Sequence, residues 1–451
     1  MESVKGKIIV RQNQEPNPED TSPEENSVRG STSERLAAKP RRRLQTLDSW
    51  RAYRDFRFLW VGNFFANTAQ WLQLLSVGWL VRDLTDSFAL SGLLVVTVGG
   101  MTTLPTLIIG PWAGVLGDRV DRRKLVMAFQ SFMAVAAVTF AVVIQTGHVE
   151  WWHAYIYVLV SGVCWSTTLT IRQTLVANTV PKESLVNAYA ANTLTITGTR
   201  IIGPFIGGIL ITTLGFFWNF AIEAGLYTAT VIAFWPMKTP YAQPRRASTG
   251  SSPLADLLEG FRYIRKQEKV IFHLIILGLI PNVLLHPVWF MLPIFTVDVL
   301  HRNADVGGYM LAVTGVGGFV SAITIASLGF GRNRGLMCIW AALFGSASIV
   351  LFAHSHWLAP ALLLIGLMSA GQATFRTSSS TLIQTLAPDH LRSRITSLHM
   401  YSQGFVFMSS LAVGLLVDQT TVVFALTIIG MAGLVLSAVA YAVFPLVRNA
   451  R

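Results

Sequence analysis

Apolar stretches alternate with short polar connections along most of the chain, from about residue 57 to residue 446. A helix of roughly 20 apolar residues crosses the hydrocarbon core of a bilayer, and each stretch is close to that length. They predict twelve membrane-spanning helices, at residues 57–81, 89–116, 124–145, 152–178, 185–213, 217–237, 270–299, 305–329, 335–353, 358–385, 392–417 and 421–446. The predicted fold class is an all-α membrane protein.

Two polar segments interrupt this pattern. Residues 1–50 are rich in Pro, Glu, Ser and Arg and lack apolar periodicity, which predicts a disordered cytoplasmic tail. Residues 238–269 predict a cytoplasmic linker. Its second half places Leu254, Leu257, Leu258, Phe261 and Ile264 on one helical face, as in an amphipathic helix on a membrane surface.

Composition and charge placement agree with a membrane location. Of the 451 residues, 52% are hydrophobic and only 13% are charged, about half the charged share of a soluble domain. The net charge is +12, and the basic residues are concentrated in the tail, the linker and short loops, so no basic domain is left to bind nucleic acid. The lysine and arginine asymmetry of the loops predicts that both termini are cytoplasmic.

The two halves of the chain resemble each other. Residues 173–181 and 381–388 share a Gln/Thr/Leu pattern that ends in proline, and Arg172 and Arg376 occupy equivalent places in the fourth and tenth spans. This repeat predicts two pseudo-symmetric six-helix bundles, as in alternating-access transporters. The predicted divisions are a tail (1–50), an N-terminal bundle (51–237), a linker (238–269), a C-terminal bundle (270–446) and a cytoplasmic C-terminus (447–451).

Polar residues recur inside the spans at helical spacing. A lipid-facing stripe of amides would leave hydrogen-bond donors unpaired, so such stripes are expected to face the bundle interior or a watery cavity. The candidate cavity residues are Asn63, Asn67, Gln70, Trp165, Thr168, Arg172, Asn192, Asn282, His286 and Arg376. Hydrogen bonding between helices without substrate contact is an equally open interpretation for each of them.

Charged residues within the spans are rarer. Arg200 lies near the middle of the fifth span and Glu223 about two turns into the sixth. An unpaired charge at that depth costs at least about 2.5–3.5 kcal/mol, so we expect the two side chains to pair. The alternatives for this pair are a structural role and a role in proton or substrate coupling. For proton coupling Glu223 is the first candidate, and His286 and Asp298 are weaker ones.

A dense charge cluster separates the second and third spans. It contains Gly114, Asp118, Arg119, Asp121, Arg122 and Arg123. The pattern resembles the loop 2–3 signature of the major facilitator superfamily, with Asp121 in place of the usual glycine. The resemblance implies a conformational latch, in which ion pairs at helix ends are made in one state and broken in the other.

A second motif follows in the fifth span. Arg200, Gly203, Pro204, Gly207 and Gly208 resemble the Gly/Pro signature associated with export, and the first hairpin is similar to that of bacterial enterobactin and macrolide exporters (the transmembrane secretion effector type). Proline permits a bend and glycines permit close helix contact, although any polytopic protein can contain such a packing seam. That exporter branch often has an aspartate where this chain has Gln70, and an amide cannot carry a proton.

Other function classes find little support. There is no phosphate-binding glycine loop and no cluster with metal-ligand spacing, and Cys164 and Cys338 are isolated, so we expect no enzyme activity, cofactor or metal. The preferred hypothesis is proton-coupled export of an amphiphilic small molecule by a monomer in the cytoplasmic membrane. The alternatives are a nutrient importer with the same fold and a non-transporting membrane sensor or scaffold.

Overall fold

The computed structural model describes residues 48–109, 112, 120–241, 253–328, 333–388 and 391–450. Every regular element in these ranges is helical. The elements of the first half are α1 (Asp48–Ala52), α2 (Arg54–Leu84), α3 (Ser91–Met101), α5 (Arg122–Gln145), α6 (Trp151–Thr179), η2 (Lys182–Ser184), α7 (Leu185–Leu214) and α8 (Phe216–Phe234). Residues 1–47 of the predicted tail lie outside the described part.

The second half begins with α9 (Pro253–Lys266), which falls where the linker helix is predicted. The remaining elements are α10 (Lys269–Leu279), η3 (Ile280–Leu284), η4 (His286–Trp289), α11 (Leu292–Asp298), α12 (Ala304–Leu328), α13 (Arg334–Ala353), α14 (Leu358–Leu386), α15 (Arg392–Tyr401), η5 (Ser402–Phe405), α16 (Val406–Gln419), α17 (Val422–Val443) and α18 (Pro445–Arg448).

Ten helices of the described chain are long and apolar enough to cross a membrane, and each matches a predicted span. The other two predicted spans differ for physical reasons. The first corresponds to α2, a 31-residue helix whose amide stripe lowers its hydropathy. The eleventh is divided by η5 into two pieces of 10 and 14 residues, neither long enough alone.

The seventh predicted span is also interrupted. Its helix α10 passes into the π-helical turn η3 and then the 3₁₀ turn η4 before α11 begins. The carbonyls freed by this break are satisfied by side chains, since Gln372 Nε2 donates to Pro281 O (3.1 Å) and Ser409 Oγ donates to Val283 O (2.8 Å). Irregular backbone at membrane depth is tolerated where protein or a cavity surrounds it.

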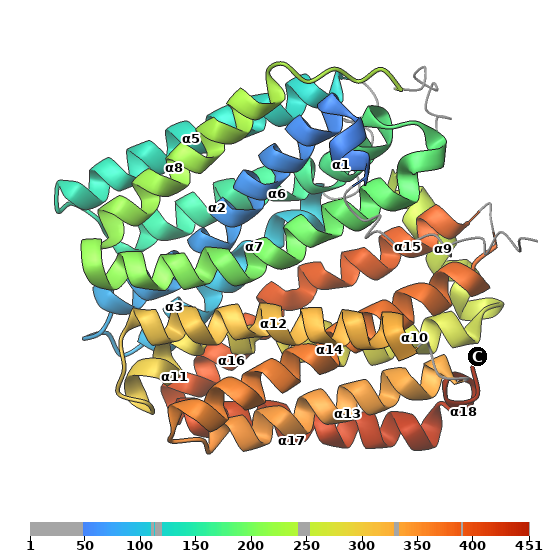
Figure 1. Ribbon diagram of the computed structural model, residues 1–451. Coiled ribbons are helices and arrows are strands. Elements are labelled where there is room, and N and C mark those ends of the chain that lie inside the picture. The colour runs from blue at the N-terminus through green and yellow to red at the C-terminus, as the bar shows by residue number, and fades with distance from the viewer. Residues whose placement is uncertain are drawn as a thin grey trace, which may run out of the picture. The chain divides into compact units, whose positions relative to one another are not determined.

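The helices form two groups that follow the two halves of the chain (Figure 1). In the first group α2 packs on α7 and α8, and α5 packs on α6 and α8; in the second, α14 packs on α12 and α13, and α13 packs on α17. The groups meet along two helix pairs, α7 with α12 and α3 with α16. A site between the groups therefore draws on both halves of the sequence.

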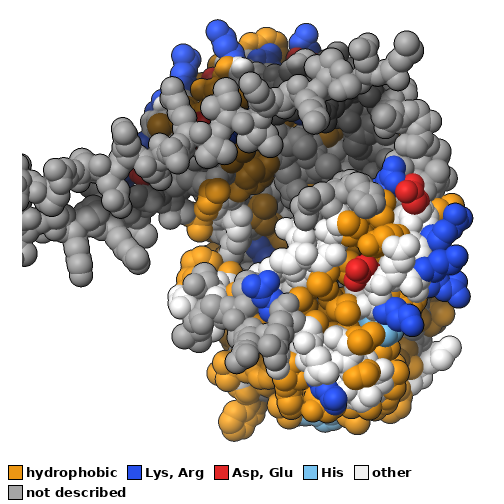
Figure 2. Space-filling model, turned by 90° about the vertical axis from the view of Figure 1, so that its right-hand side faces the viewer, with side chains coloured by type: hydrophobic (Ala, Val, Ile, Leu, Met, Phe, Trp, Pro, Cys, Tyr) orange, Lys and Arg blue, Asp and Glu red, His pale blue; other side chains and the backbone are white. Residues whose placement is uncertain are grey.

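The outer faces of the helices are apolar. Side chains such as Val135, Ile232, Leu351 and Leu363 are more than 60% exposed. Contiguous apolar surface on this scale is uncommon in soluble proteins and is what a lipid-facing helix requires. At the face that carries α9, α15 and the C-terminus, Lys and Arg side chains outnumber acidic ones (Figure 2).

A single glycine forms the turn between α7 and α8. Gly215 has φ +84°, a conformation that side-chain-bearing residues rarely adopt, and its amide bonds to the carbonyls of Leu210 and Ile211. The turn is as tight as the sequence predicts, because α7 ends at Leu214 and α8 begins at Phe216.

Candidate substrate site

Arg200 lies where the two helix groups meet. It projects from α7, and its guanidinium carbon is 5.3 Å from the ring centroid of Trp71 on α2 and 4.5 Å from that of Trp289 on η4. The two indole rings are themselves 6.1 Å apart. A desolvated cation–π contact contributes about 2 kcal/mol or more, so two indoles compensate part of the cost of holding a charge at this depth.

The hydrogen bonds of Arg200 cross to the second half. Its Nη2 donates to Ser369 Oγ on α14 (3.0 Å) and to Thr314 Oγ1 on α12 (3.3 Å), while Nε has no partner. Within the described ranges no carboxylate lies within ion-pair distance of Arg200. The guanidinium is held in place by neutral groups and keeps an unsatisfied donor.

The predicted Arg200–Glu223 pair is wrong. Glu223 is fully buried in α8, within the first group, where Tyr157 Oη donates to its Oε1 at 2.6 Å. Phe140 and Phe220 pack around Tyr157 and close this pocket. Both charged residues lie inside the protein, but a helical position gives depth only, and the side chains project toward different helices.

A second cationic group stands near Arg200. Arg376 of α14 is exposed, as expected of a side chain that lines a water-accessible space. The charge of Arg376 is close enough to interact electrostatically with both Arg200 and His286. The His286 ring packs 4.5 Å from Trp289, and Asn282 is buried one turn earlier in η3. Two predicted cavity residues of the second half, Arg376 and His286, thus lie near Arg200.

The first-half cavity residues form a separate cluster. Gln70, Trp165, Thr168 and Arg172 line one small cavity between α2 and α6, with room for about one water molecule. The Arg172 guanidinium lies 5.2 Å from the Trp165 ring, and its Nε and Nη1 have no hydrogen-bond partner. The fourth-span stripe therefore faces the interior, as predicted.

The amide stripes of the first and fifth spans face each other. Asn63 Nδ2 donates to Asn192 Oδ1 at 2.9 Å, and Ser161 Oγ donates to Gln73 Oε1 at 2.7 Å. Asn67 is also buried. For Asn63 and Asn192 this geometry matches the hydrogen-bonding interpretation, although Asn63 Oδ1 is buried without a partner.

The Gly/Pro seam lies against two helices. Gly203 approaches Thr68 and Trp71 of α2, and Gly207 packs against Leu72 and Leu75. Gly208 instead faces α12, where a Cβ atom at its position would lie 2.7 Å from Ala304 O and 3.0 Å from Gly308 Cα. Pro204 is inside α7, and its carbonyl also borders Gly308. The seam brings the backbones of the two groups into contact.

The predicted latch is only partly within the described chain. Gly114, Asp118 and Arg119 lie outside it. Asp121 caps α5 by accepting from the amides of Arg123 (2.9 Å) and Lys124 (3.1 Å), and Arg123 Nη1 donates to Met237 O after the end of α8. These contacts fix the hairpin to its own helix group, and Arg122 also has a partner.

At the ends of the helices opposite this hairpin, polar contacts that the sequence did not predict join the two groups. Arg82 on α2 binds Asp86 and, across the groups, Asp298 at 2.9 Å, so Asp298 is a half-exposed ion-pair partner far from Glu223. Asp418 at the end of α16 accepts from the backbone amides of Gly92 and Leu93. The signal was present in the sequence, as isolated charges beside predicted external loops.

No cluster of metal-ligating side chains occurs in the part of the chain that the structure describes. Cys164 and Cys338 are both buried and free, as the sequence predicts.

Comparison with known proteins matches this architecture. The sequence pattern of the transmembrane secretion effector family covers residues 49–450. The chain is 25% identical over 358 residues to the enterobactin exporter EntS of Shigella boydii serotype 4, which covers 79% of this chain and 83% of that protein. EntS of Escherichia coli O139:H28 has the same identity and coverage.

Solved structures share the fold at low identity. A mutant form of the nucleoside transporter NupG superposes with a TM-score of 0.71 and 13% identity, covering 86% of this chain and all of the other. A D-xylose–proton symporter gives a TM-score of 0.66 with 13% identity over 86% of this chain and 96% of the other. At these identities the likeness concerns the fold alone.

Proposed function

Because the chain belongs to the transmembrane secretion effector family of the major facilitator superfamily, we propose that it exports an amphiphilic small molecule bearing an acidic group across the cytoplasmic membrane. It is a multi-pass membrane transporter and not an enzyme. We further propose that it works as a monomer by alternating access, in which the two helix groups rock about the contact between α7 and α12.

The substrate class rests on one observation, the absence of an acid beside Arg200 in the described chain. Arg200 and Arg376 are two neighbouring guanidiniums, and the hydrogen-bond acceptors of Arg200 are hydroxyls. Guanidinium binds carboxylate, phenolate or phosphate oxygens through paired donors. Trp71 and Trp289 add an aromatic surface, so an acidic amphiphile satisfies both features of the site.

Export is the direction we infer. Support comes from the EntS proteins of Shigella boydii and Escherichia coli, which are enterobactin exporters and align with four-fifths of this chain. We place the basic face of Figure 2 in the cytoplasm, with both termini, because lysine and arginine are retained on that side. The Arg82–Asp298 and Asp418 ties then lie at the outer face.

The charged loop 114–124 belongs on the opposite, cytoplasmic side in this orientation. We propose it as a conformational latch whose ion pairs are made in one state and broken in the other, with Asp118 and Arg122 as its key members. The contacts of Asp121 and Arg123 support this proposal, since they fix the start of α5 to the first group.

Glu223 is the proposed proton carrier. It is fully buried, and one of its oxygens accepts a hydrogen bond from Tyr157. Tyr227 interacts electrostatically with Glu223. It also lines the small cavity that Gln70 and Arg172 line, and this cavity provides a polar route toward the carboxyl of Glu223. Asp298 is a poor alternative because Arg82 engages it at the outer face.

The direct test is efflux from proteoliposomes with a panel of siderophores, macrolides and dyes, in which each acid is paired with its methyl ester. We expect the acids to be exported and the esters not, and an uncoupler to stop export. Transport of esters and acids alike would overturn the substrate class, and accumulation toward the cytoplasmic side would favour an importer. Absence of transport for the whole panel, with binding of a partner protein, would favour a sensor.

A further inference from the structure

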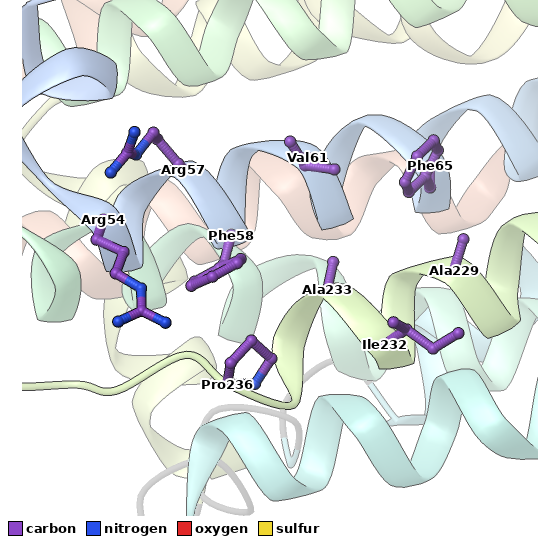
Figure 3. Close-up of a pocket in the computed structure, with 9 residues that line it drawn as sticks. All are labelled: Arg54, Arg57, Phe58, Val61, Phe65, Ala229, Ile232, Ala233 and Pro236. Carbon is purple, nitrogen blue, oxygen red and sulfur yellow. The ribbon is translucent and has the colours of Figure 1, made fainter.

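A groove of about 710 Å³ lies between α2 and α8 on the outside of the first helix group (Figure 3). On α2 it is lined by Arg54, Arg57, Phe58, Val61 and Phe65, which recur every three or four residues and so share one face of the helix. The two arginines lie at one end of the groove and Phe65 at the other (Figure 3). The groove therefore has a cationic mouth and an apolar length.

The α8 wall of the groove is uncharged. It consists of Ala229, Ile232 and Ala233, at helical spacing, and of Pro236 just after the end of the helix. Ile232 is 66% exposed, and the adjacent Trp235 is 72% exposed, as expected for side chains in contact with lipid. Tryptophan is enriched where a membrane helix meets the headgroup layer, which places the cationic mouth at that depth.

The arginines at the mouth are available to a ligand. Both are exposed, and within the described ranges neither forms an ion pair with a carboxylate. The Arg54 guanidinium lies 5.5 Å from the Phe58 ring, a contact that restricts its motion. Asp55, the acid between them, is occupied as an acceptor for the Lys238 amide at 2.8 Å. Two cations thus face outward beside an apolar channel.

The length of the groove matches one leaflet. From Arg54 to Phe65 the helix rises about 16 Å, and half of the hydrocarbon core of a bilayer is about 15 Å. A single phospholipid presents the complementary pattern, with a charged phosphate at one end and an acyl chain of this reach below it.

We propose that the α2–α8 groove is a binding site for an anionic phospholipid of the adjacent leaflet, with its headgroup phosphate on Arg54 and Arg57 and one acyl chain along Phe58, Val61 and Phe65. This site is separate from the Arg200 site, because it opens to the outside of the first group. It does not depend on the substrate or direction of transport.

Native mass spectrometry of the full chain tests the site, with phosphatidylglycerol and phosphatidylcholine of identical acyl chains as probes. We expect phosphatidylglycerol to bind more tightly, and Arg54→Gln/Arg57→Gln to weaken it roughly 30-fold, since each arginine near an anionic surface contributes about a factor of five. Arg262→Gln/Arg265→Gln on α9 removes the same charge elsewhere and is the matched control. Equal loss in the two double variants would overturn the site in favour of general surface attraction.

A second variant tests the apolar part of the groove. Ala233→Phe fills the channel and leaves both arginines in place, so we expect it to weaken phosphatidylglycerol binding at least tenfold. Soluble glycerophosphate should not compete with the lipid for the wild-type protein. Undiminished lipid binding by Ala233→Phe, or equal binding of phosphatidylcholine by the wild type, would overturn the proposal.

Discussion

The carboxylate of Asp418, near the end of α16, accepts a hydrogen bond of 2.7 Å from the backbone amide of Gly92 in the first turn of α3. Its second oxygen accepts from the amide of Leu93 at 2.8 Å. The two helices belong to different groups, and a carboxylate at a helix N-terminus gains from both the unpaired amides and the helix dipole. Together with Arg82–Asp298, this contact holds one end of the two groups closed.

Asp418→Asn is expected to shift the protein toward the state that is open at this end. Hydrogen bonds to a charged acceptor contribute about 1.5–3 kcal/mol, so the open fraction should rise roughly tenfold to a hundredfold. The measurement is the distance between spin labels at Ser87→Cys and Thr420→Cys, two exposed positions on opposite groups. Asp83→Asn removes a neighbouring exposed acid that has no part in either contact, and should leave the distance unchanged. An unaltered distance distribution in Asp418→Asn would contradict the closing role.

The sequence predicted the helices well because lipid imposes a simple requirement of about 20 apolar residues. It did not predict the interruption at η3, because the backbone there is stabilised by distant donors. Gln372 and Ser409, which bond to the carbonyls of Pro281 and Val283, are 91 and 126 residues away. Local pattern contains no information on such partners.

For the candidate site, the sequence predicted which residues face the interior but not which of them contact one another. Periodicity gave the inward faces that carry Gln70, Trp165 and Arg172, and these do share a cavity. It could not give the partner of Arg200, since Trp289 follows the helix break and Ser369 is 169 residues away. Charge complementarity favoured Glu223, but two indoles and two hydroxyls hold the guanidinium instead.

Glu223→Gln is expected to abolish uncoupler-sensitive efflux while leaving the protein folded. The amide can still accept the hydrogen bond from Tyr157 but can neither bind nor release a proton at the working pH. The measurement is efflux from proteoliposomes with an imposed pH gradient. It is compared with counterflow driven by a substrate gradient, which needs no proton. Glu183→Gln, at an exposed acid in η2, is the matched control. Gradient-driven efflux that persists in Glu223→Gln would remove this residue as the proton carrier.

Arg200→Gln is expected to weaken binding of acidic substrates roughly tenfold to a hundredfold, the range for loss of about 1.5–3 kcal/mol from a charged hydrogen bond. Because no carboxylate of the described chain pairs with Arg200, the substitution leaves no acid unpaired and should change the melting temperature little. Arg200→Lys keeps the charge but not the planar guanidinium that contacts both Trp71 and Trp289, so an intermediate loss is expected.

Substrate affinity for Arg200 variants is measured by tryptophan fluorescence of the purified protein, with each acid compared with its ester. Arg262→Gln on α9 is the control for a change in net charge alone. Equal losses for acid and ester would mean that Arg200 supports the shape of the site rather than the charge of the substrate.

Gly208→Leu is expected to force α7 and α12 apart. Even a Cβ atom at this position would lie 2.7 Å from Ala304 O, and neither backbone can retreat without moving its helix group. Overpacking of this kind costs about 1–3 kcal/mol, which should appear as a lower melting temperature and slower efflux. In the same helix, Gly198 has no neighbour within 4 Å of its Cβ position, so Gly198→Ala is a matched control.

The control should stabilise the protein, by about 0.5–1 kcal/mol, because alanine restricts the unfolded chain in a helix that has room for its methyl group. If Gly208→Leu were as stable and as active as Gly198→Ala, α7 and α12 would not need close backbone contact. Rocking of the two helix groups about this pair would then be the wrong description of transport.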